Sequence, residues 1–368
     1  DRLLADPRYG ERWGRHWLDV AGYVDIIGAD NDAGGISLAP GIWRYRDYVV
    51  DAFNSDKPFD EFLVEQVAGD ELFDWRSVES FSPRQLEQII ATGFLRHARD
   101  STSSPELNTA DIRHQVLYET LQTVSTSLLG LTVHCAQCHS HKFDPISQAD
   151  YYRLAAVFTP SLDVQNWIQA NKRHLHTVPP SQKAWIDQHN GRVNTSVAEL
   201  KKQLAAIEVM VSKRLRETKL AALPEPVRSD TDKAVKVAKE KRNPIEAYLA
   251  SRLGPLVAVS PTEVRAALTA TQLATVTGAE AEIARLMASR QSYETVRVTW
   301  EAGPPPPTFL YRRGDYTTPG PEVKPGVPVV LDPAGRRTPI PQTGLAANKS
   351  SSGRRLAFGE RRRRGDVS

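Results

Sequence analysis

The chain has 368 residues, of which 40% are hydrophobic and 25% charged, and its formal net charge is +3. This length suits two or three domains, with enough apolar material for a core and with long exposed segments attached to it. The weak basic excess predicts no binding to nucleic acid, because part of it comes from an arginine run at 361–364 that we interpret as a solvated tail. No stretch offers the ~18 apolar residues that a bilayer span needs, so we expect no membrane span.

Residues 1–165 are rich in Trp, Tyr, Phe and His, and we expect a compact helical domain there. In "SPRQLEQIIATGF", Ser82 and Gln85 have the spacing of a capping box, which predicts a helix that starts at Pro83 and stops near Gly93. The chain itself begins within a helical pattern, which predicts a fragment or a processed product.

Two more helices are predicted on either side of the two cysteines. A stripe of apolar residues predicts a helix over 109–129, which Gly130 ends. Ser147 and Asp150 resemble a further cap, which predicts another helix start directly after the cysteine segment.

Residues 182–290 are expected to form a helical arm, because aromatic residues become scarce and Ala, Lys, Glu and Arg dominate. Segments at 231–241, 261–274 and 279–290 are expected to return as antiparallel helices. The first part of this arm carries a seam of apolar residues. The seam either binds a partner as a coiled coil or packs within the chain, and we favour the second interpretation. Its apolar residues alternate spacings of four and three, which is typical of a heptad repeat: Val193, Val197, Leu200, Leu204, Ile207 and Val211.

Residues 291–335 change character again, and short strands are predicted in "YETVRVTW", "TFLYRRGDYTTPG" and "GVPVVL". The last stretch, 336–368, is polar and is expected to be a disordered or truncated tail. Together these elements predict a mainly α chain, in which a compact helical domain is followed by a coiled-coil-like helical arm and a short β-rich segment.

The segment "HCAQCHSHKFDPI" holds both cysteines of the chain, Cys135 and Cys138, and His139 follows at once. Random placement would give this arrangement in roughly one of 7,000 chains, so accident is excluded. A C-x-x-C-H run suits covalent c-type haem attachment, because two thiols reach one porphyrin edge and the next imidazole meets the iron. The pattern therefore favours haem c on Cys135 and Cys138, with His139 as the proximal ligand.

Two other chemistries stay open for the cysteine pair. A structural zinc needs four tetrahedral ligands from separated arms, and only one C-x-x-C exists. His141 lies too close to His139 for both to hold the same ion, although His134 or a distant histidine could contribute. A thioredoxin-like redox pair needs a βαβ setting, whereas the surrounding sequence predicts helices.

A haem held in this way has a second axial position, and His97 is the distal ligand that we predict. A structural role is the competing interpretation for this and every other single histidine. An empty distal position would favour ligand binding or catalysis over simple electron transfer. The other candidates are His16, His114, His174, His176, Met210 and Met287.

The loop "GADNDAGG" gathers Asp30, Asn31 and Asp32 among glycines. Such oxygen-rich loops can bind calcium, but this composition is more typical of a simple turn. No serine-hydrolase elbow, phosphate-binding loop or dinucleotide fingerprint appears, so the sequence indicates no reaction and leaves open whether the protein is an enzyme.

Four stretches together resemble the planctomycete cytochrome-c-associated family called domain of unknown function 1549. They are "PRYGERWGRHWLDVAGYVD", "IWRYRDYVVDAFNSDKPFDEFLVEQVAGDEL", "ATGFLRH" and "LLGLTVHCAQCHSHKFDPISQADYYRLAAVFTP". One departure is Gly22-Tyr23-Val24-Asp25, where the family leads us to expect a run like Arg-Tyr-Ala-Asp. Any role of that arginine is absent here.

The resemblance implies an exported, multidomain, haem-associated protein and no known reaction. The segment "RRGDYTTPGPEVKPGVPVVL" resembles the linker to a second family of unknown function, which would start near "SSGRRLAF". We therefore expect a c-type haem-binding, electron-transfer-associated domain in the periplasm or another extracytoplasmic compartment. Its partner would be a redox protein or a downstream domain absent from this chain. The alternative is a zinc-stabilised structural or interaction module.

Overall fold

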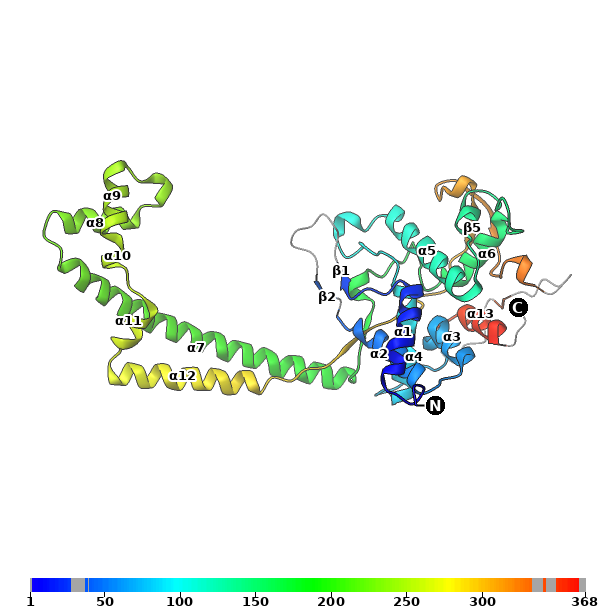
Figure 1. Cartoon of the computed structure of the whole chain (residues 1–368), viewed down its shortest axis with the longest axis horizontal. Helices are drawn as coiled ribbons and strands as arrows, with labels where there is room; N and C mark the ends of the chain where they lie inside the picture. Colours follow the sequence, from blue (N-terminus) through cyan, green and yellow to red (C-terminus); the bar gives the residue numbers. More distant parts are fainter. Residues whose placement is uncertain (1, 28–36, 39, 333–339, 342–348, 364–368) are drawn as a thin grey trace. The chain divides into compact units, whose positions relative to one another are not determined.

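The computed structural model describes residues 2–27, 37–38, 40–332, 340–341 and 349–363. The chain divides into two compact units, one made of residues 1–180 with 293–368 and the other of residues 181–292 (Figure 1). Helices dominate both units and the sheets have only two strands each, which confirms the mainly α fold class.

The core of the first unit is built from aromatic side chains. Trp17, Tyr45 and Phe62 are buried together, and the Trp17 indole donates to the Tyr45 hydroxyl at 3.0 Å. Small residues let two helices approach, since a Cβ at Gly10 would lie 2.2 Å from the Val50 carbonyl oxygen. The helices of this unit are α1 (Arg8–Ala21), α2 (Trp43–Asn54), α3 (Phe59–Ala68), α4 (Pro83–Ala91), α5 (Ala110–Val124), α6 (Gln148–Phe158) and α13 (Arg354–Arg363).

Among the described residues, three antiparallel strand pairs complete the first unit. They are β1 (Ile26–Ile27) with β2 (Ser37–Leu38), β3 (His174–His176) with β4 (Thr295–Arg297), and β5 (Thr308–Tyr311) with β6 (Pro319–Val323). Strand β3 precedes the second unit in the chain and β4 follows it, so the second unit is an insertion in the first.

The predicted helix starts around the cysteine segment are confirmed. Capping boxes begin α4 at Ser82 and α6 at Ser147, and α5 continues as a π-helical turn over Ser125–Leu129 until Gly130, whose φ is 65°. The end of α4 differs from the prediction, because the chain continues as a 3-10 helix, η2 (Thr92–Arg96). Gly93 serves packing there, since a Cβ would lie 3.3 Å from the Tyr45 ring.

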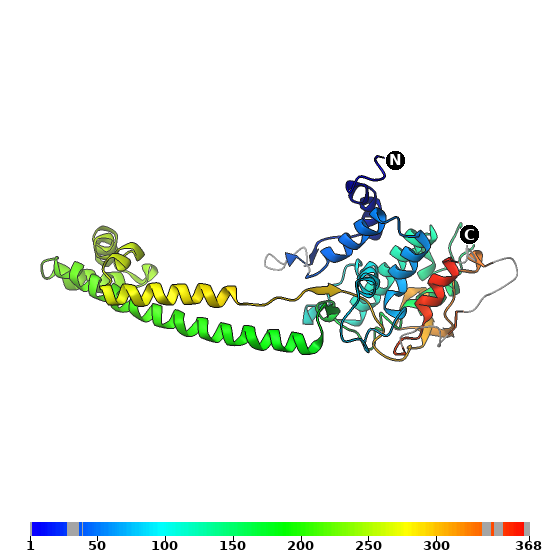
Figure 2. The same ribbon diagram turned by 90° about the horizontal axis from the view of Figure 1, so that it is seen from below.

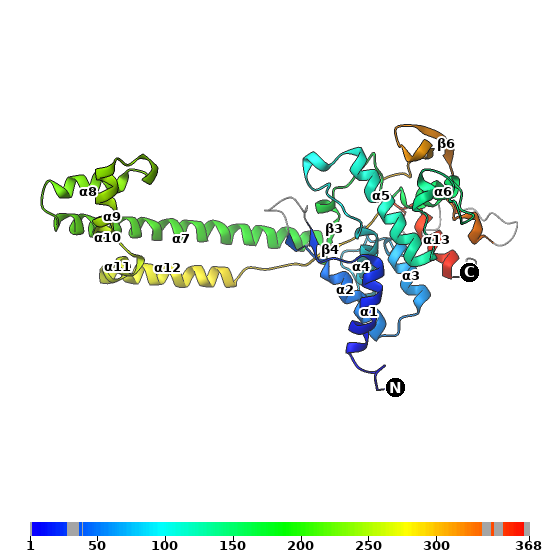
Figure 3. The same cartoon turned by 45° about the horizontal axis from the view of Figure 1, so that its top comes forward.

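The second unit contains the predicted arm of antiparallel helices. Its two long helices, α7 (Pro180–Ala221) and α12 (Ala270–Ala288), run side by side in Figures 1, 2 and 3. Three seam residues, Val193, Val197 and Val211, are buried, and His189 Nε2 lies 2.9 Å from the Ser289 carbonyl oxygen. These contacts favour the intramolecular seam. The shorter helices are α8 (Val227–Lys236), α9 (Pro244–Arg252), α10 (Gly254–Val257) and α11 (Pro261–Ala266).

Two expectations for the last part of the chain are corrected. The segment "GVPVVL" is not a strand, because Val329–Leu331 form a 3-10 turn behind Pro328, which has no N–H to give to a sheet. Within the expected disordered tail, 336–368, α13 is a helix that packs on α3 (Figure 1). Its Arg355 is buried, and its guanidinium lies 2.8 Å from Asp70 Oδ1 and 3.1 Å from Glu71 Oε1. Pairing allows this polar segment to enter the core.

None of the helices in the described ranges combines the length and the apolar character that crossing a bilayer requires.

Candidate functional site

Between α5 and α6, Cys135 lies on a short 3-10 turn, η5 (His134–Gln137), and Cys138 is the residue that directly follows it. The buried side chains of Val133 and Ala136 anchor the turn, and the Ala136 N–H donates to the Val133 carbonyl oxygen at 2.9 Å. Cys135 and Cys138 therefore fall on the outer side of the turn, where both side chains are exposed and neither forms a disulfide.

Helix α6 holds the turn through side chains that the sequence did not single out. Gln148, the first residue of α6, directs its Nε2 at three carbonyl oxygens, those of Gln137 at 2.9 Å, Cys138 at 3.1 Å and Tyr311 at 2.9 Å. The Tyr152 hydroxyl also donates to the Gln137 oxygen, at 3.0 Å. The cysteine turn and strand β5 are thus tied to one amide group.

A glycine in the turn between β5 and β6 allows this turn to approach the second cysteine closely. Gly314 has a φ of 77°, and a Cβ there would lie 2.7 Å from Cys138 Sγ. Any other residue would be strained in this conformation and would push against the sulfur. A glycine between Arg313 and Asp315 was the only sign of this contact in the sequence.

Replacing Gln148 with leucine is expected to lower the free energy of unfolding by about 2 kcal/mol, because carbonyl oxygens of Cys138 and Tyr311 lose their donor. Urea unfolding measures the change. Gln115→Leu is the matched control, since Gln115 is an exposed α5 glutamine that donates to Glu119 at 2.8 Å. Equal stability of the two variants would show that the Gln148 amide does not hold the turn.

His139 is exposed and has the tautomer that a metal ligand needs. Its Nδ1 lies 2.8 Å from the Ser140 carbonyl oxygen. A carbonyl oxygen can only accept, so Nδ1 carries the proton and the lone pair lies on Nε2. In contrast, His141 Nδ1 accepts the Asp144 N–H at 2.8 Å and so belongs to its own turn.

His97, the predicted distal ligand, lies in the aromatic core. Its ring packs 4.7 Å from that of Tyr45 and 5.6 Å from that of Tyr23, and neither ring nitrogen has a hydrogen-bond partner among the described residues. Burial, together with the nearby Arg297 and Arg96, lowers the pKa of His97 to about 3. No hydrogen bond, ion pair or ring contact described for His97 involves the cysteine turn. Its distal role stays a prediction.

The remaining candidate ligands are dispersed. His16 packs on Trp13, His114 lies among tyrosines, and His174 and His176 belong to β3. Met210 and Met287 are exposed in the second unit. The loop at 28–35, whose composition is more typical of a simple turn than of a calcium site, lies outside the described residues. Within the described ranges, no group of three or more His, Cys, Asp or Glu side chains is placed to hold a metal ion.

The fold and the site define a mainly α domain that presents an exposed C-x-x-C-H turn. Residues 1–163 match the family PSCyt2, described as a protein of unknown function (DUF1549). The resemblance seen in the sequence is confirmed for these residues, and the resemblance of the later segment to a linker stays a prediction. Comparisons with curated proteins and with solved structures found no match.

Proposed function

We propose that Cys135, Cys138 and His139 carry one c-type haem, and that the chain is an electron-transfer-associated part of an exported multidomain protein. One observation carries the proposal: two free, exposed thiols share a turn with an exposed histidine whose Nδ1 bonds a carbonyl oxygen. Histidines that bind metals usually donate their other ring N–H in this way. The name of the family adds support, since it refers to cytochromes.

The residues present fit such a group. The two thiols would form the thioether links, and His139 Nε2 would face the iron. A haem bound in this way supplies a site that takes up and releases single electrons. Gln148 and Tyr152 keep the turn in place, and buried tyrosines beneath it, whose pKa values burial raises, remain uncharged at neutral pH.

The surface beside His139 is where we place the redox partner or a further domain. Phe143, which is 84% exposed, offers an apolar contact there. Aromatic residues are enriched at protein–protein interfaces relative to the rest of the surface. Because c-type haem is attached outside the cytoplasmic membrane, the proposal includes a periplasmic or other extracytoplasmic location.

The test is to produce the full chain with a cytochrome c maturation system. We expect a mass increase of one haem and the sharp α-band of a reduced pyridine haemochrome. C135A/C138A should lose the covalent haem completely, whereas H141A, a neighbouring histidine held in its own turn, should keep it. H139A should keep the thioether links but change the visible absorption spectrum of the matured protein, recorded without pyridine.

Two outcomes would contradict the proposal. One is the mass of the bare polypeptide after correct maturation. The other is a colourless protein with one zinc per chain, which would establish the alternative of a zinc-stabilised module.

A further inference from the structure

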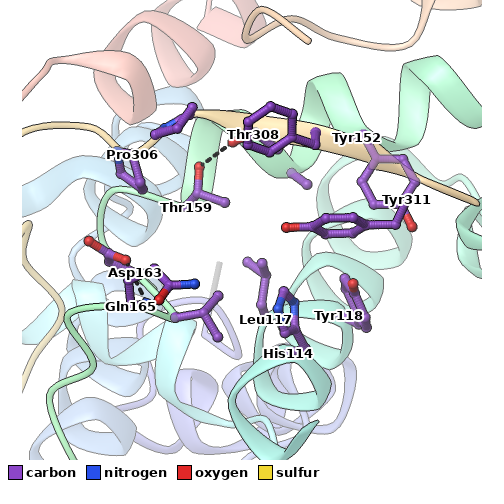
Figure 4. Close-up of a pocket in the computed structure, with 14 residues that line it drawn as sticks. His114, Leu117, Tyr118, Tyr152, Thr159, Asp163, Gln165, Pro306, Thr308 and Tyr311 are labelled. Atoms are coloured by element: carbon purple, nitrogen blue, oxygen red, sulfur yellow. Dashed lines mark hydrogen bonds between the residues drawn. The ribbon is translucent and has the colours of Figure 1, made fainter. Parts of the chain in front are cut away.

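A cavity of about 170 Å³ lies between α5, α6 and β5 (Figure 4). His114, Leu117 and Tyr118 of α5 form one wall, and Thr159 and Thr308 lie across from them. Neither cysteine is among the residues that line it. The inference that follows therefore goes beyond the haem proposal and does not depend on it.

The size and the walls of the cavity suit one flat ring. An apolar cavity of ~150 Å³ in another protein holds benzene. Here the walls include aromatic rings of Tyr152, Phe309 and Tyr311 together with Pro306 and Pro307. Aromatic walls favour offset and edge-to-face contacts with a planar ring. A fused ring system would need more space.

The polar groups at the cavity favour an uncharged occupant. Thr159 and Thr308 bond each other through their hydroxyls at 3.0 Å. The Asp163 carboxylate accepts the N–H groups of Gln165 at 2.9 Å and Asn166 at 3.2 Å, so its charge is compensated within its own turn. Burial lowers the pKa of His114 to about 4, which makes this histidine neutral at pH 7.

Two buried polar atoms of residues that line the cavity, Tyr118 Oη and His114 Nδ1, lack a hydrogen-bond partner among the described residues. His114 is 5% exposed, and its Nδ1 is buried without a hydrogen-bond partner among the described residues. The ring is held rigidly, stacked 4.4 Å from the ring of Tyr316 and edge-on to Tyr311 at 5.5 Å. A buried nitrogen without a partner is unfavourable, so a ligand that bonds it gains affinity. A hydroxyl group can donate or accept, and it therefore suits either tautomer.

We propose that this cavity binds a monocyclic phenol, with the ring between the aromatic walls and the hydroxyl hydrogen-bonded to His114.

The experiment compares phenol with toluene, which has the same size and lacks the hydroxyl, by calorimetric titration of the full chain. Phenol is expected to bind about tenfold more tightly than toluene, the effect of one hydrogen bond to a buried group. His114→Phe should remove that difference by weakening phenol about tenfold while toluene binding persists. His134→Phe, a change at an exposed histidine, should alter neither affinity.

A second measurement does not require a variant. In the unmodified chain, the ring ¹⁵N signals of His114 should shift on addition of phenol and stay unchanged with toluene. Equal affinities for the two probes, no binding at millimolar concentration, or His114 signals that ignore phenol would each overturn the proposal.

Discussion

Replacing Arg355 with methionine is expected to lower the free energy of unfolding of the first unit by about 3 to 5 kcal/mol. Arg355 is 0% exposed, and its two terminal nitrogens lie 2.8 Å from the two carboxylate oxygens of Asp70. One of them also lies 3.1 Å from Glu71 Oε1. Methionine fills similar space but leaves two buried carboxylates without their cation. Removing one partner of a buried ion pair lowers the stability more than replacing the whole pair with apolar residues.

The effect of this substitution should depend on pH in a defined direction. Burial, with Asp70 and Glu301 nearby, already raises the pKa of Glu71. Without Arg355 the pKa of Glu71 rises further, and a carboxyl group whose pKa is raised in the folded state contributes less stability as the pH increases. The loss should therefore be larger at pH 8 than at pH 5.

Urea unfolding followed by tryptophan fluorescence measures the change, since all tryptophans except Trp185 lie in the first unit. Arg8→Met is the matched control, because Arg8 pairs with Asp6 on the surface and its loss should have no measurable effect. A loss of less than ~1 kcal/mol in Arg355→Met would mean that α13 is not held by this ion pair.

Acidification is expected to destabilise the haem-free chain through His97, by about 3 kcal/mol between pH 6.5 and pH 4. Burial and the charges of Arg297 and Arg96 keep the folded pKa near 3, while the unfolded chain takes up the proton near pH 6.5. The unfolded state thus binds more protons in this window, and the stability present above pH 6.5 is lost as the pH falls.

His97→Phe should remove much of that acid sensitivity. At pH 7 the variant should be about as stable as the parent, because neither imidazole nitrogen has a hydrogen bond to lose and the Tyr23 and Tyr45 rings can pack on phenylalanine. Part of the slope remains, because burial also lowers the pKa of His114. Urea unfolding of the parent chain and of His97→Phe at pH 7, 5.5 and 4 measures the effect. If the free energy of unfolding depends on pH equally in both, His97 is not the cause of the acid sensitivity.

The same substitution tests the predicted distal ligand. If His97 binds the iron, His97→Phe also changes the spectrum of the matured protein. An unchanged spectrum excludes His97 from that position and leaves it with the packing role that its aromatic neighbours indicate.

Local signals in the sequence predicted the helix starts near the site well. A cap depends on residues three positions apart, so Ser82 with Gln85 and Ser147 with Asp150 were readable without the fold. The C-x-x-C-H turn was readable for the same reason.

Features that depend on distant partners could not be predicted. The sequence of helix α13 suggests a polar tail, but Asp70 and Glu71, far away in the chain, pair with its buried Arg355, and Phe158 packs on its Phe358. Gln148 looks like any first residue of a helix until the fold brings three carbonyl oxygens around its amide.

Strands β3 and β4 have a further consequence for how this architecture can change over time. His176 and Thr295 are paired in the ladder, so the polypeptide leaves the first unit and returns to it at neighbouring positions. The segment between those two positions can therefore be lengthened, shortened or replaced without changing the residues that hold the cysteine turn. Relatives of this chain should therefore differ most in the second unit and least in the first.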